Sequence, residues 1–158
     1  MVQIHHKQSG NVFFEVEADN LIGANLMGAY LIHADLSFQD MTSAQLVFCN
    51  LSGADLRGAN LKNANLSGAN LTETDLTQVD LTGANLSGAT LSLTILHGCI
   101  GLHTVKGLDK IVHANPSEVD EATLSASITN IPDTFMRGAG FTWSEIGFYR
   151  SKFDSHDA

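Results

Sequence analysis

The sequence has 158 residues, a formal net charge of −9 and 44% hydrophobic residues, which is typical of one soluble globular domain with room for a small appendage. Its 8 lysines and arginines are too few for non-specific nucleic-acid binding, which relies on cations that neutralise phosphates. The acidic balance favours solubility and is compatible with a basic partner.

The cysteines and the first residues predict where the protein works. Cys49 and Cys99 are far apart in the sequence, and neither belongs to a C-x-x-C motif. No disulfide framework is therefore expected, and a reducing compartment is indicated. Residues 1–20 contain no apolar run long enough for a signal peptide or a membrane span. We expect a cytoplasmic protein with no membrane partner.

Residues 1–18 are expected to form an N-terminal β cap. Two β-prone runs, 2–5 and 12–16, lie on either side of the turn sequence KQSG. Phe14 and Val16 stand in the register of the repeat that follows, one unit early. A phenylalanine where later units hold a small residue suits a plug at the end of a fold better than an interior position.

Residues 19–98 repeat every five residues. Two positions before the large apolar residue of each unit stands an alanine in ten of 16 units, the position between them is mostly Asn or Asp, and glycine follows two positions later in half of the units. The expected core consists of the large apolar residues Leu21, Leu26, Leu31, Leu36, Met41, Leu46, Leu51, Leu56, Leu61, Leu66, Leu71, Leu76, Leu81, Leu86, Leu91 and Leu96.

A period of five fits neither standard element. In an α-helix the leucines would spiral around every face, and in a flat strand successive leucines would point to opposite faces. The leucines share one interior only if the chain turns by a fixed angle in every unit. The small residue and the leucine then point inward, and Asn, Asp and Gly, which tolerate turn conformations, lie outside and at the corners.

The units GANL, GADL and GANLSGAT resemble the A(D/N)LxX pattern of the pentapeptide-repeat family over residues 19–98. The resemblance implies an all-β solenoid, the right-handed quadrilateral β-helix or Rfr fold, in which four units make one coil. Residues 19–98 would then form about four coils, followed by a small C-terminal α-helical appendage. The stretch GNVFFEVEADNLIGANL resembles the start of many bacterial, especially cyanobacterial, members of this family.

Residues 99–158 lack the repeat and are expected to form a C-terminal cap and short helices. The irregular apolar run 99–113 would cover the open end of the solenoid. Three helices are predicted: one starting at Asn115-Pro116, one over 132–137 closed by Gly138, and one opened by the capping box at 142–145 and ending near Lys152. Trp143, Phe148 and Tyr149 on the last helix would form an interaction face or pack against the solenoid.

The tail carries a second resemblance. The stretches GLHTVKGLDKIVHANPSEVD and IPDTFMRGAGF resemble the segment that joins pentapeptide repeats to Toll/interleukin-receptor (TIR) type signalling domains in some bacterial proteins. The resemblance covers about residues 101–150. No effector domain follows before Ala158, so no TIR activity is assigned to this sequence.

Two sets of outward-facing residues are candidates for an interaction surface. The first set makes the first coil and the start of the second unusually apolar, and consists of Ile22, Met27, Tyr30, Ile32, Phe38 and Phe48. Such a patch suits a protein partner or a dimer contact. Alternatively, the N-terminal hairpin folds over these residues.

The second set is the column Asp35, Asp55 and Asp75, which a stacking interval of 20 residues would align. One interpretation is an acidic stripe for a basic partner or a cation. The other is that Asp and Asn are interchangeable turn residues of this repeat. A metal site needs convergent ligands rather than a ladder, so no metal is expected here.

No catalytic or cofactor site is predicted. His97, Cys99 and His103 are too few for a zinc site, and both cysteines continue the inward register of the small residues. No nucleophile has a recognisable base, and no phosphate-binding loop is present.

The sequence therefore predicts a non-catalytic protein-interaction scaffold or regulatory module with no cofactor. The expected partner is another protein, with no direct contact to nucleic acid, and homo-oligomers could form through the ends. The alternative is a DNA mimic that inhibits or protects a type II topoisomerase such as gyrase. The acidic charge favours that alternative, whereas the short core and the absence of inserted loops disfavour it.

Overall fold

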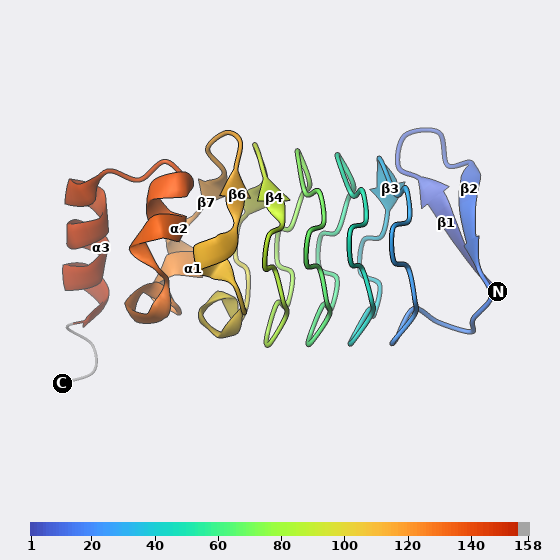
Figure 1. The fold of residues 1–158 in the computed structure, drawn as a ribbon, viewed down its shortest axis with the longest axis horizontal. Coiled ribbons are helices and arrows are strands. Elements are labelled where there is room, and N and C mark those ends of the chain that lie inside the picture. The colour runs from blue at the N-terminus through green and yellow to red at the C-terminus, as the bar shows by residue number, and fades with distance from the viewer. Residues whose placement is uncertain (155–158) are drawn as a thin grey trace.

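In the computed structural model, which describes residues 1–154, the chain forms an elongated β-helix solenoid with strands at one end and helices at the other (Figure 1). Residues twenty positions apart pair in parallel, for example Asn25 with Gln45 and Asn65 with Asn85. Backbone hydrogen bonds follow the same interval, because the Leu66 N–H donates to the Asn85 carbonyl at 2.8 Å. Each coil therefore supplies the hydrogen-bond partners of the next.

The large apolar residues of the repeat, fifteen leucines and Met41, fill the interior. All sixteen of these residues, from Leu21 to Leu96, are at most 2% exposed. In extended backbone, alternate side chains point to opposite sides. The small residue and the leucine therefore point inward, and the residue between them points outward. Burying each large side chain stabilises the fold by about 1.5–3 kcal/mol, so this ladder is the main apolar contribution to stability.

The units from Leu21 to Leu86 each close with a β-turn that explains the glycines. The Ala54 N–H donates to the Leu51 carbonyl at 2.9 Å, and Gly53, the third residue of this turn, has a φ of 65°. Glycine adopts positive φ without a steric penalty. Phe38 and Phe48 occupy the same turn position with φ values of 58° and 56°, a conformation that bulky residues rarely adopt.

The N-terminal end is a hairpin of β1 (Val2–His6) and β2 (Val12–Val16), close to the strands predicted from the sequence. β1 also pairs with β3 (Ala34–Asp35), so the order β2-β1-β3 leaves β2 at the edge. Ile4 is the hairpin residue buried against the first coil, at 2% exposure, whereas Phe14 is only half-buried. The plug is therefore mainly Ile4.

Pairing continues beyond Gly98 although the sequence repeat stops there. Thr90 pairs with Val112 and Ile95 with Glu118, so the interval lengthens from 20 to 22 and then 23 residues. Short 3₁₀ turns at Leu102–Thr104 and Leu108–Lys110 take up the extra residues. The irregular coil contributes β6 (Val112–His113) and β7 (Glu118–Val119). These strands pair with β4 (Thr90–Leu91) and β5 (Ile95–Leu96) of the preceding coil, respectively.

The prediction of a helix starting at Asn115-Pro116 is wrong. The Glu118 N–H donates instead to the Thr94 carbonyl at 2.9 Å, and β7 pairs with β5. The open edge of the preceding coil offered these residues ladder partners that a helix could not use. Helix α1 (Glu121–Ser125) begins later, with Asp120 as its N-cap residue.

The last two helices lie close to their predicted positions. They are α2 (Asp133–Gly138) and α3 (Trp143–Asp154), preceded by a 3₁₀ turn at Ile128–Asn130. The predicted capping box is confirmed, since Glu145 accepts the Thr142 N–H at 2.7 Å and its own N–H donates to the Thr142 hydroxyl at 3.2 Å. Within residues 1–154, no helix is both long and apolar enough to cross a lipid bilayer.

Candidate functional site

The apolar residues of the first coils lie on the surface. Their exposed fractions are 51% for Ile22, 61% for Met27, 73% for Tyr30, 39% for Ile32, 77% for Phe38 and 70% for Phe48. The hairpin sits on the end of the solenoid and pairs with β3 (Figure 1). It leaves these side chains exposed.

Three of the six residues lie on neighbouring chain segments. The Gly28 N–H donates to the Val47 carbonyl at 2.8 Å, and Tyr30 pairs with Asn50. The segments that carry Met27 and Tyr30 therefore run beside the segment that carries Phe48. We name Met27, Tyr30 and Phe48 the apolar cluster. Phe38 is half of the 20-residue interval away from Phe48 and so lies on the opposite side of the solenoid.

Phe48 is exposed at a cost in backbone energy. Left-handed backbone is about 1–2 kcal/mol less favourable for a residue with a side chain. A side chain that is 70% exposed recovers little of this cost through burial. The ring lies against Gly68 of the next coil, where an added Cβ would overlap it. Phe48 therefore gains one packing contact within the fold, but most of its side chain stays on the surface.

Tyr30 also departs from the local rule of the repeat. At this position most units carry Asn or Asp, whose side chain accepts the N–H two residues later, as Asn25 accepts from Met27 at 3.2 Å and Asn50 from Ser52 at 3.1 Å. This bond fixes the turn. A tyrosine has no side-chain group that can replace it at this distance, so Tyr30 gives up a local stabilising contact.

The aspartate column exists, but its residues serve the turns. Asp35 pairs with Asp55 and Asp55 with Asp75 across successive coils. Each carboxylate accepts the N–H two residues later, at 3.1, 3.1 and 2.9 Å respectively. These are the same bonds that the asparagines make, which supports the interpretation of Asp and Asn as interchangeable turn residues.

Arg57 compensates part of the negative charge. Its Nε–H donates to Asp55 Oδ1 at 2.9 Å, and the same nitrogen lies 3.9 Å from Asp75 Oδ2. The hydrogen bond from the Arg57 side chain is the main reason why the pKa of Asp55 lies below its ordinary value. The column is therefore not a continuous anionic stripe.

The residues His97, Cys99 and His103 have separate partners. His97 Nε2 lies 3.4 Å from a Glu118 oxygen, and His103 Nδ1 lies 3.2 Å from the Ser127 hydroxyl. The Cys99 thiol donates to the Leu76 carbonyl at 3.1 Å. No group of three or more metal-ligating side chains occurs in the part of the chain that the structure describes.

Both cysteines are core residues. Cys49 and Cys99 are 1% and 3% exposed, and they remain free thiols. Burial raises the pKa of Cys99 to about 12 and also raises that of Cys49. A thiol that does not ionise near neutral pH is a poor nucleophile.

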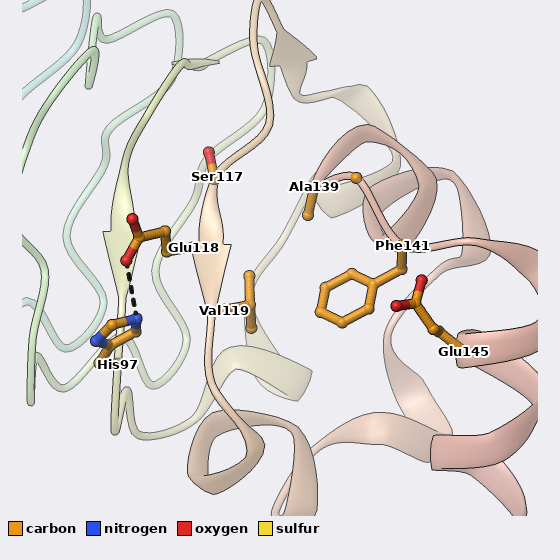
Figure 2. A pocket seen from close by; sticks show the side chains of 8 residues that line it. His97, Ser117, Glu118, Val119, Ala139, Phe141 and Glu145 are labelled. Atoms are coloured by element: carbon orange, nitrogen blue, oxygen red, sulfur yellow. Dashed lines mark ion pairs between the residues drawn. The ribbon is translucent and has the colours of Figure 1, made fainter.

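One pocket, of about 310 Å³, lies between β7 and the connection from α2 to α3 (Figure 2). Val119 and Phe141 form its apolar walls, and His97, Glu118 and Glu145 lie around it. Glu145 is committed to the capping box of α3, and the bonds from Thr142 hold its pKa below the ordinary value. Sequence reasoning missed this pocket, because long-range packing brings its two sides together.

The last helix divides its aromatic residues between the surface and the core. Trp143 and Phe148 are 64% and 59% exposed, whereas Tyr149 packs on the core, with Phe141 edge-on at 5.9 Å. Sequence reasoning also missed Leu93, which is 55% exposed. The signal was present in the sequence, because Leu93 stands at a turn position where half of the units have glycine.

The geometry described so far agrees with a known family. The family model described as pentapeptide repeats matches residues 20–58 and 59–98 in 8 copies. The chain belongs to the pentapeptide-repeat family. The family predicted from the pentads is thereby confirmed, and so is the β-helix solenoid. Among curated proteins, none matches this chain.

Several solved structures of pentapeptide-repeat proteins are similar to this chain. Rfr23 from the cyanobacterium Cyanothece 51142 shares 38% identity at a TM-score of 0.57, over 62% of this chain and 66% of that one, so this chain spans about two thirds of its relative. A protein from the Arabidopsis thaliana thylakoid lumen shares 25% identity at a TM-score of 0.48, over 75% and 88%. QnrB1, a plasmid-mediated fluoroquinolone resistance protein, shares 18% identity at a TM-score of 0.47, over 76% of this chain and 63% of that one.

Proposed function

We propose that this protein is a non-catalytic protein-interaction module that binds another protein through the apolar cluster of Met27, Tyr30 and Phe48. The observation that carries the proposal is that these side chains are 61–73% exposed on a regular backbone whose later coils carry mainly small or polar residues at the same places. Aromatic and methionine side chains are enriched in the centres of protein interfaces.

The rigidity of the repeat supports this function. Because the backbone N–H and C=O groups of the inner coils pair with their neighbours, the cluster is presented on a surface that loses little conformational freedom on binding. We further infer that four pentads form one coil with four faces, that the helix is right-handed, and that residues 19–98 make about four such coils. The uniform 20-residue pairing interval supports this geometry.

Returning the cluster to the repeat pattern tests the proposal. The variant Met27→Ser, Tyr30→Asn, Phe48→Gly places in the first two coils the residues that other units carry, so the fold is expected to persist. Used as bait in a lysate of the source cells, the wild type should enrich a defined protein that this variant loses. The matched control Leu93→Gly, Ile95→Asn makes the same kind of change at the other end of the repeat and should retain the partner. Equal capture by all three baits would contradict the proposal.

The acidic charge favours a second candidate, a DNA mimic that acts on gyrase. The net charge of −9 supports it, whereas the ion pairs of Arg57 with Asp55 and of Lys62 with Asp80 interrupt the acidic surface. A supercoiling assay with purified gyrase decides this case. If micromolar protein neither inhibits gyrase nor protects it, the DNA-mimic function is eliminated.

The setting of the interaction is also a proposal. We infer a cytoplasmic, reducing location, because Cys49 and Cys99 are unpaired. The resemblance of residues 101–150 to segments that join pentapeptide repeats to TIR domains suggests a role in signalling, so a captured protein with a TIR domain would fit this proposal best.

A further inference from the structure

The pocket between β7 and the connection from α2 to α3 is polar at two ends and apolar between them (Figure 2). The Phe141 ring of the connection points toward Val119 of β7. Glu118 lies beyond Val119, on the side of His97, and Glu145 lies beyond Phe141, at the start of α3. The apolar walls therefore separate the two carboxylates. The volume of about 310 Å³ is at the lower end of small-molecule sites, which begin at about 300 Å³.

A buried hydroxyl at the β7 side of the pocket has no hydrogen-bond partner. Ser117 lines the pocket and is 6% exposed, and its Oγ makes no hydrogen bond within residues 1–154. Ser117 directly precedes β7, and in extended backbone residues two apart point to the same side, so it shares the side of Val119. Buried polar groups in folded proteins are nearly always paired. A ligand in the pocket would supply the partner that this hydroxyl lacks.

The lining of the pocket favours cations. Among the described residues that form it are the carboxylates of Glu118 and Glu145 and the imidazole of His97, and no lysine or arginine. The lining is therefore negative whether or not His97 is protonated. Arg137 donates to the Phe141 carbonyl at 2.7 Å, but it does not line the pocket.

Both carboxylates have an oxygen available to a ligand. The two bonds from Thr142, each 2.7 Å long, go to Glu145 Oε2, so the capping box does not need Oε1. These bonds hold the pKa of Glu145 below its ordinary value, so this carboxylate is ionised at neutral pH. The Glu118 side chain is 69% exposed, and its Oε2 lies 3.4 Å from His97 Nε2. A cation can therefore bind at either end without a rearrangement of the fold.

We propose that this pocket binds a linear aliphatic diamine in its doubly protonated form. One ammonium group pairs with Glu118 and donates to the Ser117 hydroxyl, and the other pairs with Glu145. The methylene chain between them lies against Val119 and Phe141, which removes apolar surface from water. A monoamine uses only one end, and an anion is repelled at both. A diamine is therefore the class of ligand that matches the order of groups along the pocket.

Calorimetric titration of the full chain with cadaverine, a linear five-carbon diamine, tests the proposal. We expect a dissociation constant of about 1 mM, because the carboxylates are open to water and each ion pair contributes little. Pentylamine has the same chain with one ammonium group and should bind about fivefold more weakly, and the dicarboxylate glutarate should not bind. No binding of cadaverine up to about 10 mM, or equal binding of pentylamine, would overturn the proposal.

Two charge-removing variants test the ends of the pocket. Glu118→Gln and Glu145→Gln should each weaken cadaverine binding about fivefold, and glutamine at position 145 preserves the capping box. The matched control Glu73→Gln removes the same charge from an exposed turn of the solenoid and should bind like the wild type. If the pocket variants match the control, only the general acidity of the chain attracts the diamine. Weaker binding in one of them alone would mean that one end is unused. Either result would refute the diamine site.

The variant Ser117→Ala tests the hydroxyl. Because the hydroxyl has no partner in the free protein, its removal should leave the melting temperature unchanged or slightly raised. Cadaverine should nevertheless bind about fivefold more weakly, since one hydrogen bond to the ammonium group is lost. Unchanged affinity would contradict Ser117 as an ammonium acceptor. None of these measurements involves the apolar cluster, so their failure would leave the proposed protein interaction standing.

Discussion

The N-terminal and C-terminal ends of the solenoid are closed in different ways. At the C-terminal end, Thr123 donates to the Leu96 carbonyl at 2.8 Å, Asp120 accepts the Gly98 N–H at 3.0 Å, and Phe135 is 1% exposed. At the N-terminal end, one hairpin supplies a single fully buried apolar side chain, Ile4. The C-terminal cap satisfies the last coil with side chains and covers it with helices, whereas within residues 1–154 the hairpin leaves β2 as an edge strand that is paired on one side only.

The two caps cover the terminal coils to different extents. A β-helix is a stack in which each coil contacts only its neighbours, so both terminal coils need a cap. The C-terminal cap meets that need with a small core of its own. The N-terminal cap meets it incompletely, and the exposed apolar cluster lies in the adjacent coils. The larger buried core therefore lies in the C-terminal cap, whereas the coils beside the N-terminal cap carry the exposed apolar cluster.

The largest expected effect is the loss of the C-terminal plug. Phe135→Ala removes a buried aromatic ring and should lower the free energy of unfolding by about 3–5 kcal/mol. Chemical denaturation followed by circular dichroism measures this change. Phe148→Ala, at a residue 59% exposed on α3, is the control and should change stability by less than about 0.5 kcal/mol. A comparable loss in both variants would mean that the cap does not stabilise through its core.

Removing the hydrogen bonds between cap and coil should have a smaller effect. Asp120→Ala deletes the N-cap of α1 together with the bonds to Gly98, and should cost about 1–2 kcal/mol. Burial raises the pKa of Asp120, but the bonds from Thr123 and Gly98 outweigh it and hold the pKa below 3.8.

Because the pKa of Asp120 is lower in the folded protein, the unfolded chain binds the carboxyl proton at a higher pH than the folded protein does. The stability that Asp120 contributes is therefore lost as the pH falls below about 4. Urea titrations at pH 7 and pH 3 should show a smaller gap between wild type and Asp120→Ala in acid. An unchanged gap would contradict the ionised cap.

A pair of glycine substitutions compares the two halves of the repeat. Gly68 and Gly88 both have positive φ, at 67° and 70°, but an added Cβ at Gly68 meets the Phe48 ring, whereas Gly88 has open space around it. Alanine should cost about 1 kcal/mol at either site, and up to about 1 kcal/mol more at Gly68, where the ring must leave its rotamer. Thermal unfolding measures the difference. Combining Gly68→Ala with Phe48→Gly should remove the excess, and persistence of the excess would place its origin elsewhere.

The smallest expected effect is a pH response of the C-terminal cap. Burial against Phe135, at a ring-centroid distance of 5.3 Å, lowers the pKa of His113 below 6.5. The unfolded chain then takes up this proton more readily, so the stability that His113 contributes is lost as the pH falls below about 6.5. The melting temperature should therefore decline between pH 7.5 and pH 5.5, and less steeply in His113→Phe. Equal slopes in both proteins would show that His113 does not titrate with unfolding.

The sequence was sufficient for the repeat because its information is local. A leucine every fifth position, a small residue two places earlier and a turn residue after it define the interior, the corners and the family. Each coil meets copies of itself, so one correct unit predicts its neighbours. The capping box at Thr142 is equally local, and it was predicted for the same reason.

Only the tertiary structure decided the ends and the surface. Asn115-Pro116 carries a helix-start signal, yet the following residues pair with β5, because an unpaired coil edge outweighed the local preference. Whether the hairpin covers Met27, Tyr30 and Phe48 depended on where β1 docks, and it docks on β3. The pocket beside β7 and the free edge of β2 also arise from contacts between distant segments. Spacing along the chain encodes what each unit does to the next, but not which surfaces are left after the ends have packed.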